Sequence, residues 1–465
     1  MSEVVLPLPA ETNKGLGHSV MTVGVAALAG LMFGLDIGVI SGALQFIGKT
    51  FHASDFAKEW IVSSMMFGAA AGALGAGFLS FRMGRKFSLI VGAVLFVLSS
   101  LACAGAWSVE SLMVFRVVLG VAIGIASFTA PLYISEVAPR DKRGAMISTY
   151  QLMITIGILA VFLSDTLFAY IEAWRWMLGI VALPGVLFLI GVILLPDSPR
   201  WLMMRGRTAD AKKVLDTLRG DAKIVTSEMD EIAEQLKRPQ RGWTMFRENT
   251  NFRRSVGLGV ALQVMQQFTG MNVVMYYAPS IFGVVGFKGQ DALWGTAIVG
   301  LVNVLSTFIA IAIVDKVGRR PILLGGFAVM AIGLGALGVA LHIGTTELPM
   351  QIFAVAMLLM FIVGFAVSAG PVVWVLCSEV QPIEGRDFGI AVSTFTNWAA
   401  NFVVGLTFLS MLTGLGSGPT FGIYAALNAA FLVVTFLFVP ETKGVSLEAI
   451  EVNLMAGKPL RQIGE

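Results

Sequence analysis

Twelve long stretches of this chain are apolar and nearly free of charge, and they constrain its fold more than any other feature. A helix needs about 20 such residues to cross about 30 Å of hydrocarbon, and it satisfies all its backbone polar groups within one segment. Hydrophobic residues make up 56% of the chain and charged residues 13%, so the apolar side chains must face lipid. We therefore predict an all-helical membrane protein that spans the bilayer at residues 20–46, 60–81, 87–107, 112–134, 144–168, 176–195, 255–282, 292–314, 321–341, 348–376, 388–412 and 420–439.

Three short motifs occur twice, about half a chain length apart. The pairs are SEVAPRDKR and SEVQPIEGR, beginning at Ser135 and Ser378; GRK and GRR, at Gly84 and Gly318; and PDSPR and PETKG, at Pro196 and Pro440. Internal similarity of this kind is typical of transporter folds with two related halves, which bind cargo between the repeats near the bilayer midplane. We expect an N-terminal six-helix half, a cytosolic linker, a C-terminal six-helix half and a cytosolic tail, at residues 1–195, 196–254, 255–440 and 441–465.

Lys and Arg are concentrated in alternate connections between these stretches. Three connections carry three basic residues each, at 82–86, 140–143 and 316–320. The connections between them together hold Lys49, Lys58, Arg175 and Lys288. Basic loops stay in the cytoplasm, so we expect both termini and the linker on that side. The net charge of +3 reflects this retention and not a nucleic-acid surface.

The linker has a helical pattern of its own. Apolar residues recur at helical spacing over 208–218 and 227–236, and Ser227 with Asp230 resembles a capping box. A separate regulatory domain is the alternative, but so short a segment buries too little apolar surface to fold alone. We predict short helices that join the two halves.

Patterns that signal catalysis or metal binding are missing from the sequence. His18, His52 and His342 lack the spacing of a metal site, and no Ser-His-Asp or Cys-His set fits within the apolar stretches. Cys103 and Cys377 are expected at opposite ends of their helices, too far apart for a disulfide. We predict a protein that is not an enzyme and that needs no metal or other cofactor.

Two charged residues stand inside apolar stretches. Asp36 lies in LMFGLDIGVISG and Arg116 in VFRVVLGVAIG. Such charges are costly and often mark a transport path, although a structural ion pair is the alternative. Desolvation and a nearby arginine act in opposite directions on a carboxyl's affinity for protons, so a movement that hydrates or separates the pair changes that affinity. We predict that Asp36 couples proton binding to movement, whereas Asp165, near a helix end, is expected at the membrane interface.

Neutral polar side chains gather in the second half, most densely in QQFTGMNVVMYYAP from Gln266. Amides and phenols both donate and accept hydrogen bonds, and aromatic faces suit the C–H faces of a sugar ring. Any of these groups could simply bond to a neighbouring helix, but their concentration favours a site for a polyol. Further candidates in other stretches are Gln151, Asn303, Asn397, Asn401, Trp374 and Trp398.

The whole chain resembles the sugar porter family of the major facilitator superfamily. The matching stretches are LMFGLDIGVISGAL at Leu31, QLMITIGIL at Gln151, QQFTGMNVVMYYAP at Gln266, DKVGRRP at Asp315 and GPVVWVLCSE at Gly370. The resemblance implies a monosaccharide site at Gln151, Gln266, Gln267, Asn272, Asn303, Gly370, Trp374 and Asn397, with Phe33, Tyr276 and Trp398 nearby. It assigns proton coupling to Asp36, with Arg116 as its modulator.

The resemblance also implies a set of cytosolic charges that latch the outward-facing state. These residues are Glu136, Arg143, Glu379 and Arg386, together with Arg85, Asp315 and Arg319 of the GRK and GRR loops. The chain departs from a symmetric pattern at one position, because the first-half residue that matches Asp315 is Phe81. The two halves of the latch are therefore expected to differ.

The function that the resemblance implies is proton-coupled import of a hexose, galactose or glucose, by alternating access. The expected location is the cytoplasmic membrane of a bacterium, and a monomer suffices for the mechanism. Three alternatives stay open: a pentose-proton symporter, a facilitative uniporter and a transporter-like sugar sensor. Facilitative members commonly carry an amide in place of the acid at Asp36, and a sensor would need a long signalling tail.

Overall fold

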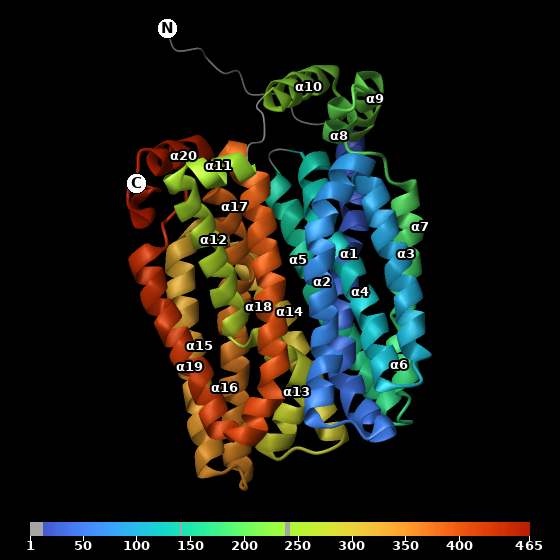
Figure 1. Cartoon of the computed structure of the whole chain (residues 1–465), viewed down its shortest axis with the longest axis vertical. Helices are drawn as coiled ribbons and strands as arrows, with labels where there is room; N and C mark the ends of the chain where they lie inside the picture. The colour runs from blue at the N-terminus through green and yellow to red at the C-terminus, as the bar shows by residue number, and fades with distance from the viewer. Residues whose placement is uncertain (1–12, 140–141, 238–241) are drawn as a thin grey trace.

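The structure, a computed structural model, describes residues 13–139, 142–237 and 242–465, and within them it holds helices and no strand. Twelve spans are long and apolar enough to cross a membrane, which confirms the predicted fold class (Figure 1). They are α1 (Asn13–Phe51), α2 (Asp55–Met83), α3 (Arg85–Ala104), α4 (Val109–Val137), α5 (Arg143–Ala169), α6 with α7 (Trp174–Ile180, Ala182–Leu194), α12 with α13 (Thr250–Phe268, Met271–Val285), α14 (Gln290–Val317), α15 (Arg319–Ile343), α16 with α17 (Leu348–Val367, Ala369–Glu379), α18 (Arg386–Gly414) and α19 (Ser417–Phe438).

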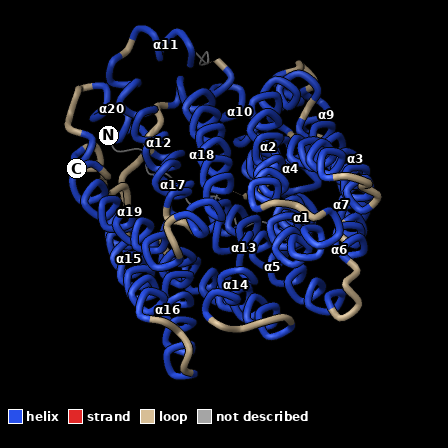
Figure 2. The backbone as a smooth tube through the Cα atoms, turned by 60° about the horizontal axis from the view of Figure 1, so that its bottom comes forward, coloured by secondary structure: helices blue, strands red, loops and turns tan. Residues whose placement is uncertain are grey.

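The first six spans and the last six meet along two pairs of helices. α2 packs on α18 and α5 packs on α14, so that helices far apart in sequence lie side by side (Figure 2). α1 also contacts α13 across the same junction. Movements of one group of helices against the other must therefore change these three contacts.

Glycines let particular helices approach each other at backbone distance. A Cβ atom on Gly34 of α1 would collide with the carbonyl oxygen of Ile154 in α5, and one on Gly157 would lie 2.5 Å from the carbonyl oxygen of Leu31. Lipid gives helices little hydrophobic reason to associate, so close packing across small residues carries much of the stabilisation. These two glycines therefore serve the packing of α1 on α5.

Two spans of the second half are interrupted near their middle. Gly270, with φ of +93°, separates α12 from α13, and Ser368, with φ of −120° and ψ of −90°, separates α16 from α17. Glycine adopts a positive φ without the steric cost that a side chain would bring. Irregular backbone at membrane depth is tolerated where protein groups satisfy it, and the Gln266 amide donates to the carbonyl oxygens of Ala369 and Gly370 at 2.9 and 3.1 Å.

The shorter helices gather at one end of the bundle, which we call the linker end (Figure 1). These helices are α8 (Pro199–Met204), α9 (Thr208–Arg219), α10 (Ala222–Leu236), α11 (Gly242–Glu248) and α20 (Leu447–Met455). The opposite end, where α1 ends and α2 begins, is called the far end. The helix predicted at 208–218 is confirmed as α9. The start predicted at Ser227 is wrong, because Asp221 accepts hydrogen bonds from the Lys223 and Ile224 amides and caps α10 earlier.

Arg219, at the end of α9, fixes the linker to the first group of spans. Its buried guanidinium donates to both carboxylate oxygens of Glu228, at 2.7 and 2.8 Å. It also donates to the carbonyl oxygens of Val137 and Ala138, where α4 ends. The linker helices thus depend on the bundle for their position.

Candidate functional site

Asp36 of α1 and Arg116 of α4 form an ion pair inside the bundle. Both side chains are 0% exposed, and Arg116 Nη1 lies 3.4 Å from Asp36 Oδ1. Arg116 Nε donates to the carbonyl oxygen of Ile61 in α2 at 2.7 Å. Asp36 Oδ2 and Arg116 Nη2 have no hydrogen-bond partner among the described residues. A buried pair that is incompletely satisfied is costly, so hydration or separation of its members changes its energy strongly.

A chain of amide hydrogen bonds joins α12, α13 and α18. Asn272 donates to Gln267 Oε1 at 2.7 Å, and Gln267 donates to Gln266 Oε1 at 3.4 Å. Asn397 donates to the same Gln266 oxygen at 2.7 Å and to Gln263 Oε1 at 2.6 Å. Through Gln266 the network reaches the carbonyl oxygen of Gly370 in α17. The structure therefore brings five of the predicted sugar-site residues into one neutral polar network.

Gln263 belongs to this network although the sequence analysis did not select it. It is buried, accepts from Asn397, and its amide lies 3.5 Å from Cys377 Sγ. Its spacing from Gln266 and Gln267 places all three on one face of α12, since residues three and four positions apart are neighbours on a helix. The spacing of these three glutamines is visible in the sequence and could have identified Gln263.

Aromatic side chains connect the two groups of spans beside the network. The rings of Phe33 in α1 and Trp398 in α18 lie 5.1 Å apart between centroids, tilted by 53°. Tyr276 of α13 is buried, and its hydroxyl accepts a hydrogen bond from the Asn401 amide at 3.1 Å. The Phe33 contact places α1, the helix that carries Asp36, directly against a predicted sugar-site residue.

Three predicted sugar-site residues remain apart from the network in this conformation. Gln151 is half-buried in α5, Asn303 is buried in α14, and Trp374 of α17 is 38% exposed. Within the described ranges, no hydrogen bond joins these side chains to the amides of α12 and α18. Their part in a sugar site stays a prediction.

The chemistry available in this region is hydrogen bonding with neutral groups. Amides and phenols can exchange partners with sugar hydroxyls without moving charge. Over the part of the chain that the structure describes, no group of three His, Cys, Asp or Glu side chains is placed to hold a metal ion. The region is therefore suited to an uncharged polar ligand.

Polar contacts between the two groups of spans lie at the far end. Glu59 of α2 is 0% exposed, and its carboxylate accepts from the Ser410 backbone N–H at 2.6 Å and from the Ser410 hydroxyl at 2.7 Å. Thr166 of α5 donates to the carbonyl oxygen of Leu293 in α14 at 3.4 Å. These contacts join the two groups of spans at the far end, and we call them the seal. The sequence analysis did not identify Glu59, because only tertiary packing places its partner opposite it.

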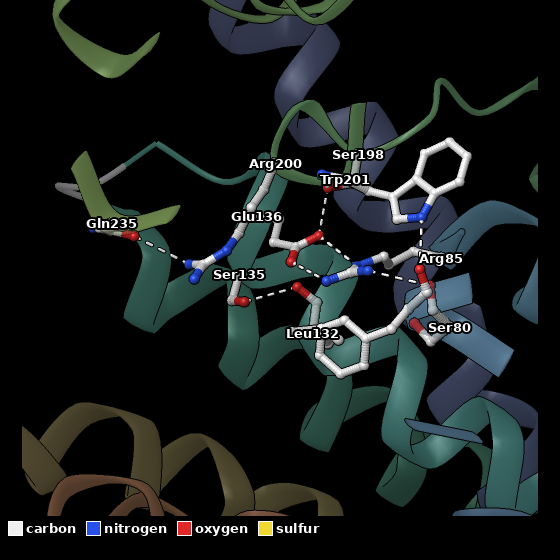
Figure 3. A network of polar contacts seen from close by, with 10 residues as sticks. Ser80, Arg85, Leu132, Ser135, Glu136, Ser198, Arg200, Trp201 and Gln235 are labelled. Atoms are coloured by element: carbon white, nitrogen blue, oxygen red, sulfur yellow. Dashed lines mark hydrogen bonds and ion pairs between the residues drawn. The ribbon is translucent and has the colours of Figure 1, made fainter. Parts of the chain in front are cut away.

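At the linker end, the repeated motifs of the first half converge on one buried cluster (Figure 3). Arg85 donates to both oxygens of Glu136 at 2.9 and 3.0 Å, and the Ser198 hydroxyl donates to the same carboxylate. Arg85 also lies over the ring of Phe81, with its guanidinium carbon 4.6 Å from the centroid. Phe81, the departure from symmetry in the sequence, thus packs against the latch arginine.

The second half repeats this cluster. Arg319 donates to Glu379 at 3.0 Å, and the Thr442 hydroxyl donates to the same carboxylate at 2.5 Å. Arg386 donates to the carbonyl oxygen of Gln381 at 3.4 Å. Among the side chains described at the linker end, no hydrogen bond or ion pair joins spans of the two groups. The side chains of Arg143 and Asp315 lie outside the described residues, so the latch stays a prediction.

One further expectation concerns the acid Asp165. Asp165, expected at the membrane interface, is 1% exposed and packs inside the bundle between α5 and α1. Its face of α5 points away from lipid, whereas the neighbouring Leu163 and Leu167 are exposed. The position of Asp165 near a helix end did not indicate which way its side chain faces around the helix.

The sequence model of the family described as sugar (and other) transporter matches residues 22–454. The chain belongs to this family. It is 59% identical to the galactose-proton symporter of Escherichia coli over 98% of this chain and 99% of that protein. It is 55% identical to the arabinose-proton symporter of Escherichia coli over 94% of each. The resemblance drawn from the motifs is confirmed.

Solved structures agree with this assignment. The partially occluded inward-open conformation of the xylose transporter XylE from Escherichia coli superposes with a TM-score of 0.81. The match has 32% sequence identity and covers 92% of this chain and 100% of XylE. The chain therefore has the major facilitator fold and is a multi-pass membrane protein.

Proposed function

We propose that this protein imports a hexose, galactose or glucose, together with a proton across the cytoplasmic membrane of a bacterium. The observation that carries the proposal is the buried Asp36, paired with Arg116 in a chain that is 59% identical to a galactose-proton symporter. A carboxylic acid can gain and lose a proton, whereas the amide of a facilitative relative cannot. We infer a monomer with two six-helix halves, 1–195 and 255–440, joined by the linker 196–254.

Coupling in this proposal depends on the energy of the Asp36 pair. Protonation removes the negative charge of Asp36 and weakens its attraction to Arg116, so α1 is freed to move against α4 and α13. One proton that enters with each sugar brings about 2.3 kcal/mol from a membrane potential of 100 mV. Because about 1.4 kcal/mol corresponds to a factor of ten, this supports more than tenfold accumulation.

Sugar recognition in this proposal uses the neutral network. The hydroxyls of a hexose would bond to Gln151, Gln266, Gln267, Asn272, Asn303 and Asn397 and to the backbone at Gly370, with Phe33, Tyr276, Trp374 and Trp398 around the ring. Several of these amides now bond to one another, so the sugar would exchange one set of hydrogen bonds for another. Such an exchange keeps binding reversible, which transport requires.

Orientation follows from the basic connections, which lie at the linker end and are expected in the cytoplasm. Both termini, the linker and the tail 441–465 would then be cytosolic, and the far end would face outside. Because Glu59 and Ser410 join the two groups of spans at this end, we infer an inward-facing conformation. We infer that Glu136, Arg143, Glu379 and Arg386 come together across the two halves when the linker end closes in the opposite conformation.

A pentose is the second candidate substrate, because an arabinose-proton symporter is 55% identical to this chain. A uniporter is disfavoured by the acid at Asp36. A transporter-like sensor would bind sugar without moving it. Hexose transport ranks first because the galactose-proton symporter is the more similar of the two relatives.

Vesicles that contain the full-length protein test this function. Addition of galactose should make the outside medium alkaline, and unlabelled galactose or glucose should compete for labelled uptake better than arabinose or xylose. Stronger competition by a pentose would change the substrate class and leave symport intact. Sugar movement without any change in external pH would refute symport.

A further inference from the structure

Asp165 is a buried acid to which the transport cycle above gives no role. It lies near the end of α5, and neither of its carboxyl oxygens has a hydrogen-bond partner among the described residues. The carboxyl packs on α1 at Gly42, where a Cβ atom would lie 2.5 Å from Asp165 Oδ2. Glycine at that position makes the space that the carboxyl occupies.

The helices around Asp165 offer it no counter-charge. α5 packs against α1, α4, α6 and α14. Toward the far end these helices carry the charged residues Asp36, Lys49, Glu110, Arg116, Arg175 and Asp291.

Each of these charges is engaged elsewhere or lies at the surface. Asp36 pairs with Arg116, and Lys49 pairs with Glu172 at 3.2 Å. Arg175 donates to the carbonyl oxygens of Ala104 and Ala106. Glu110 and Asp291 are exposed. Within the described residues, no ion pair reaches the Asp165 carboxyl.

A carboxylate in such a place is energetically unfavourable. Removing an ion from water costs several kcal/mol even after the protein relaxes. Here no cation offsets that cost, and the one backbone group that acts on the carboxyl is the N–H of Gly42, which lies inside α1. Groups in this situation become neutral instead. The sealed far end therefore holds Asp165 as an uncharged acid.

The position of Asp165 ties its hydration to the far end. Gly42 follows Asp36 by six positions on α1, about 9 Å of helix rise toward the far end. Thr166, which follows Asp165 on α5, donates to the carbonyl oxygen of Leu293 in α14 across the junction of the two groups of spans. In the proposed cycle, opening of the far end separates α5 from α14 and admits water beside Thr166, so that the neighbouring Asp165 can ionise.

We propose that Asp165 is a second protonatable site, one that takes a proton from the aqueous phase at the far end before that end seals. One proton binds a carboxylate oxygen on sealing and returns to the same phase on reopening, so it is not counted among the protons imported with sugar. The site makes sealing depend on external pH. The role of Asp165 in sealing rests on the proposed transport cycle. The protonated state of Asp165 in this structure does not depend on that cycle.

Infrared spectroscopy of the full-length protein in lipid nanodiscs tests the protonation state without any transport. The wild-type protein should show the C=O stretch of a protonated carboxyl that is lost in Asp165→Asn. Thr155→Val, a change of similar size elsewhere on α5 that removes a hydroxyl bonded to the Leu152 carbonyl oxygen of the same helix, should keep this band. Spectra of Asp165→Asn and wild type that agree in this region would overturn the proposal.

Sugar exchange in the Asp36→Asn background tests the link to sealing, because the transported proton is then absent. Raising the pH at the far end should slow exchange. Above the midpoint of this pH dependence, the rate should fall by about tenfold per pH unit, which is the slope for one required proton. Adding Asp165→Asn should reduce this dependence to less than about twofold per unit, and adding Thr155→Val should leave it unchanged.

The contradicting outcomes are distinct. An unchanged slope after Asp165→Asn would show that the residue does not control sealing. Loss of uphill accumulation in Asp165→Asn alone would make its proton a transported one and refute the gating role. Failure of the wild-type protein to move protons with sugar would refute symport, and the infrared comparison would still decide the state of Asp165.

Discussion

Removing the Ser410 hydroxyl should open the far end. Ser410 donates two hydrogen bonds to Glu59, whose carboxylate is completely buried in the sealed conformation, and Ser410→Ala removes the one made by the hydroxyl. A hydrogen bond to a charged group contributes about 1.5–3 kcal/mol. Water hydrates Glu59 when the far end is open, so the loss falls on the sealed state. Since about 1.4 kcal/mol is a factor of ten, the sealed-to-open ratio should fall by about 10- to 150-fold.

A cysteine at position 63 can report this change. Ser63 is buried in α2, and a Cβ atom on Gly405 of α18 would lie 3.0 Å from its hydroxyl, so the residue lies within the seal. The native thiols Cys103 and Cys377 are both buried and should react slowly. We expect a membrane-impermeant maleimide to label Ser63→Cys about tenfold faster, or more, when Ser410→Ala is present.

The matched control is Thr413→Val on the same helix. The Thr413 hydroxyl donates to the carbonyl oxygens of Leu409 and Ser410 within α18 and makes no bond to Glu59. Labelling should therefore stay at the rate of Ser63→Cys alone. Equal labelling rates with and without Ser410→Ala would refute the assignment of Glu59 and Ser410 as the seal.

Three further changes test the sugar network, the helix packing and the linker. Gln267→Ala should weaken sugar binding by about 5- to 150-fold, because an unpaired buried hydroxyl costs about 1–3 kcal/mol, and calorimetry should show no such loss for Gln351→Ala outside the network. Gly34→Ala should cost about 1–3 kcal/mol by forcing α1 from α5, which lowers the melting temperature, whereas Gly24→Ala meets no atom within 4 Å and should not. Arg219→Ala leaves Glu228 buried and unpaired, so it should lower the melting temperature more than Lys237→Ala, which removes an exposed pair; equal shifts would contradict this role for Arg219.

The twelve spans were predictable because lipid imposes one simple requirement on length and polarity. The interruptions at Gly270 and Ser368 were not, since a glycine or serine within an apolar stretch also fits an unbroken helix. The tertiary partner decides whether the helix breaks. At Ser368 this partner is the Gln266 amide, which donates to the carbonyl oxygens of the next two residues. The break therefore depends on a residue about a hundred positions away in the chain.

The candidate site was predictable where chemistry alone marks a residue. Asp36 and Arg116 stand out because charge is rare in apolar stretches, and the structure pairs them. Glu59 lies just inside a helix start, where an acid is ordinary, so its burial against Ser410 could not be read from sequence. The burial of Asp165 could not be predicted for the related reason that Gly42, which makes room for it, lies on another helix.

Uphill sugar uptake by Asp36→Asn tests the central claim most directly. Vesicles with an imposed inward proton gradient should accumulate sugar more than tenfold when they contain the wild-type protein. Asp36→Asn should bring sugar only to equilibrium while it still exchanges labelled for unlabelled sugar, and Asp291→Asn, a change at an exposed acid, should accumulate normally. Accumulation by Asp36→Asn at the wild-type level would contradict the account.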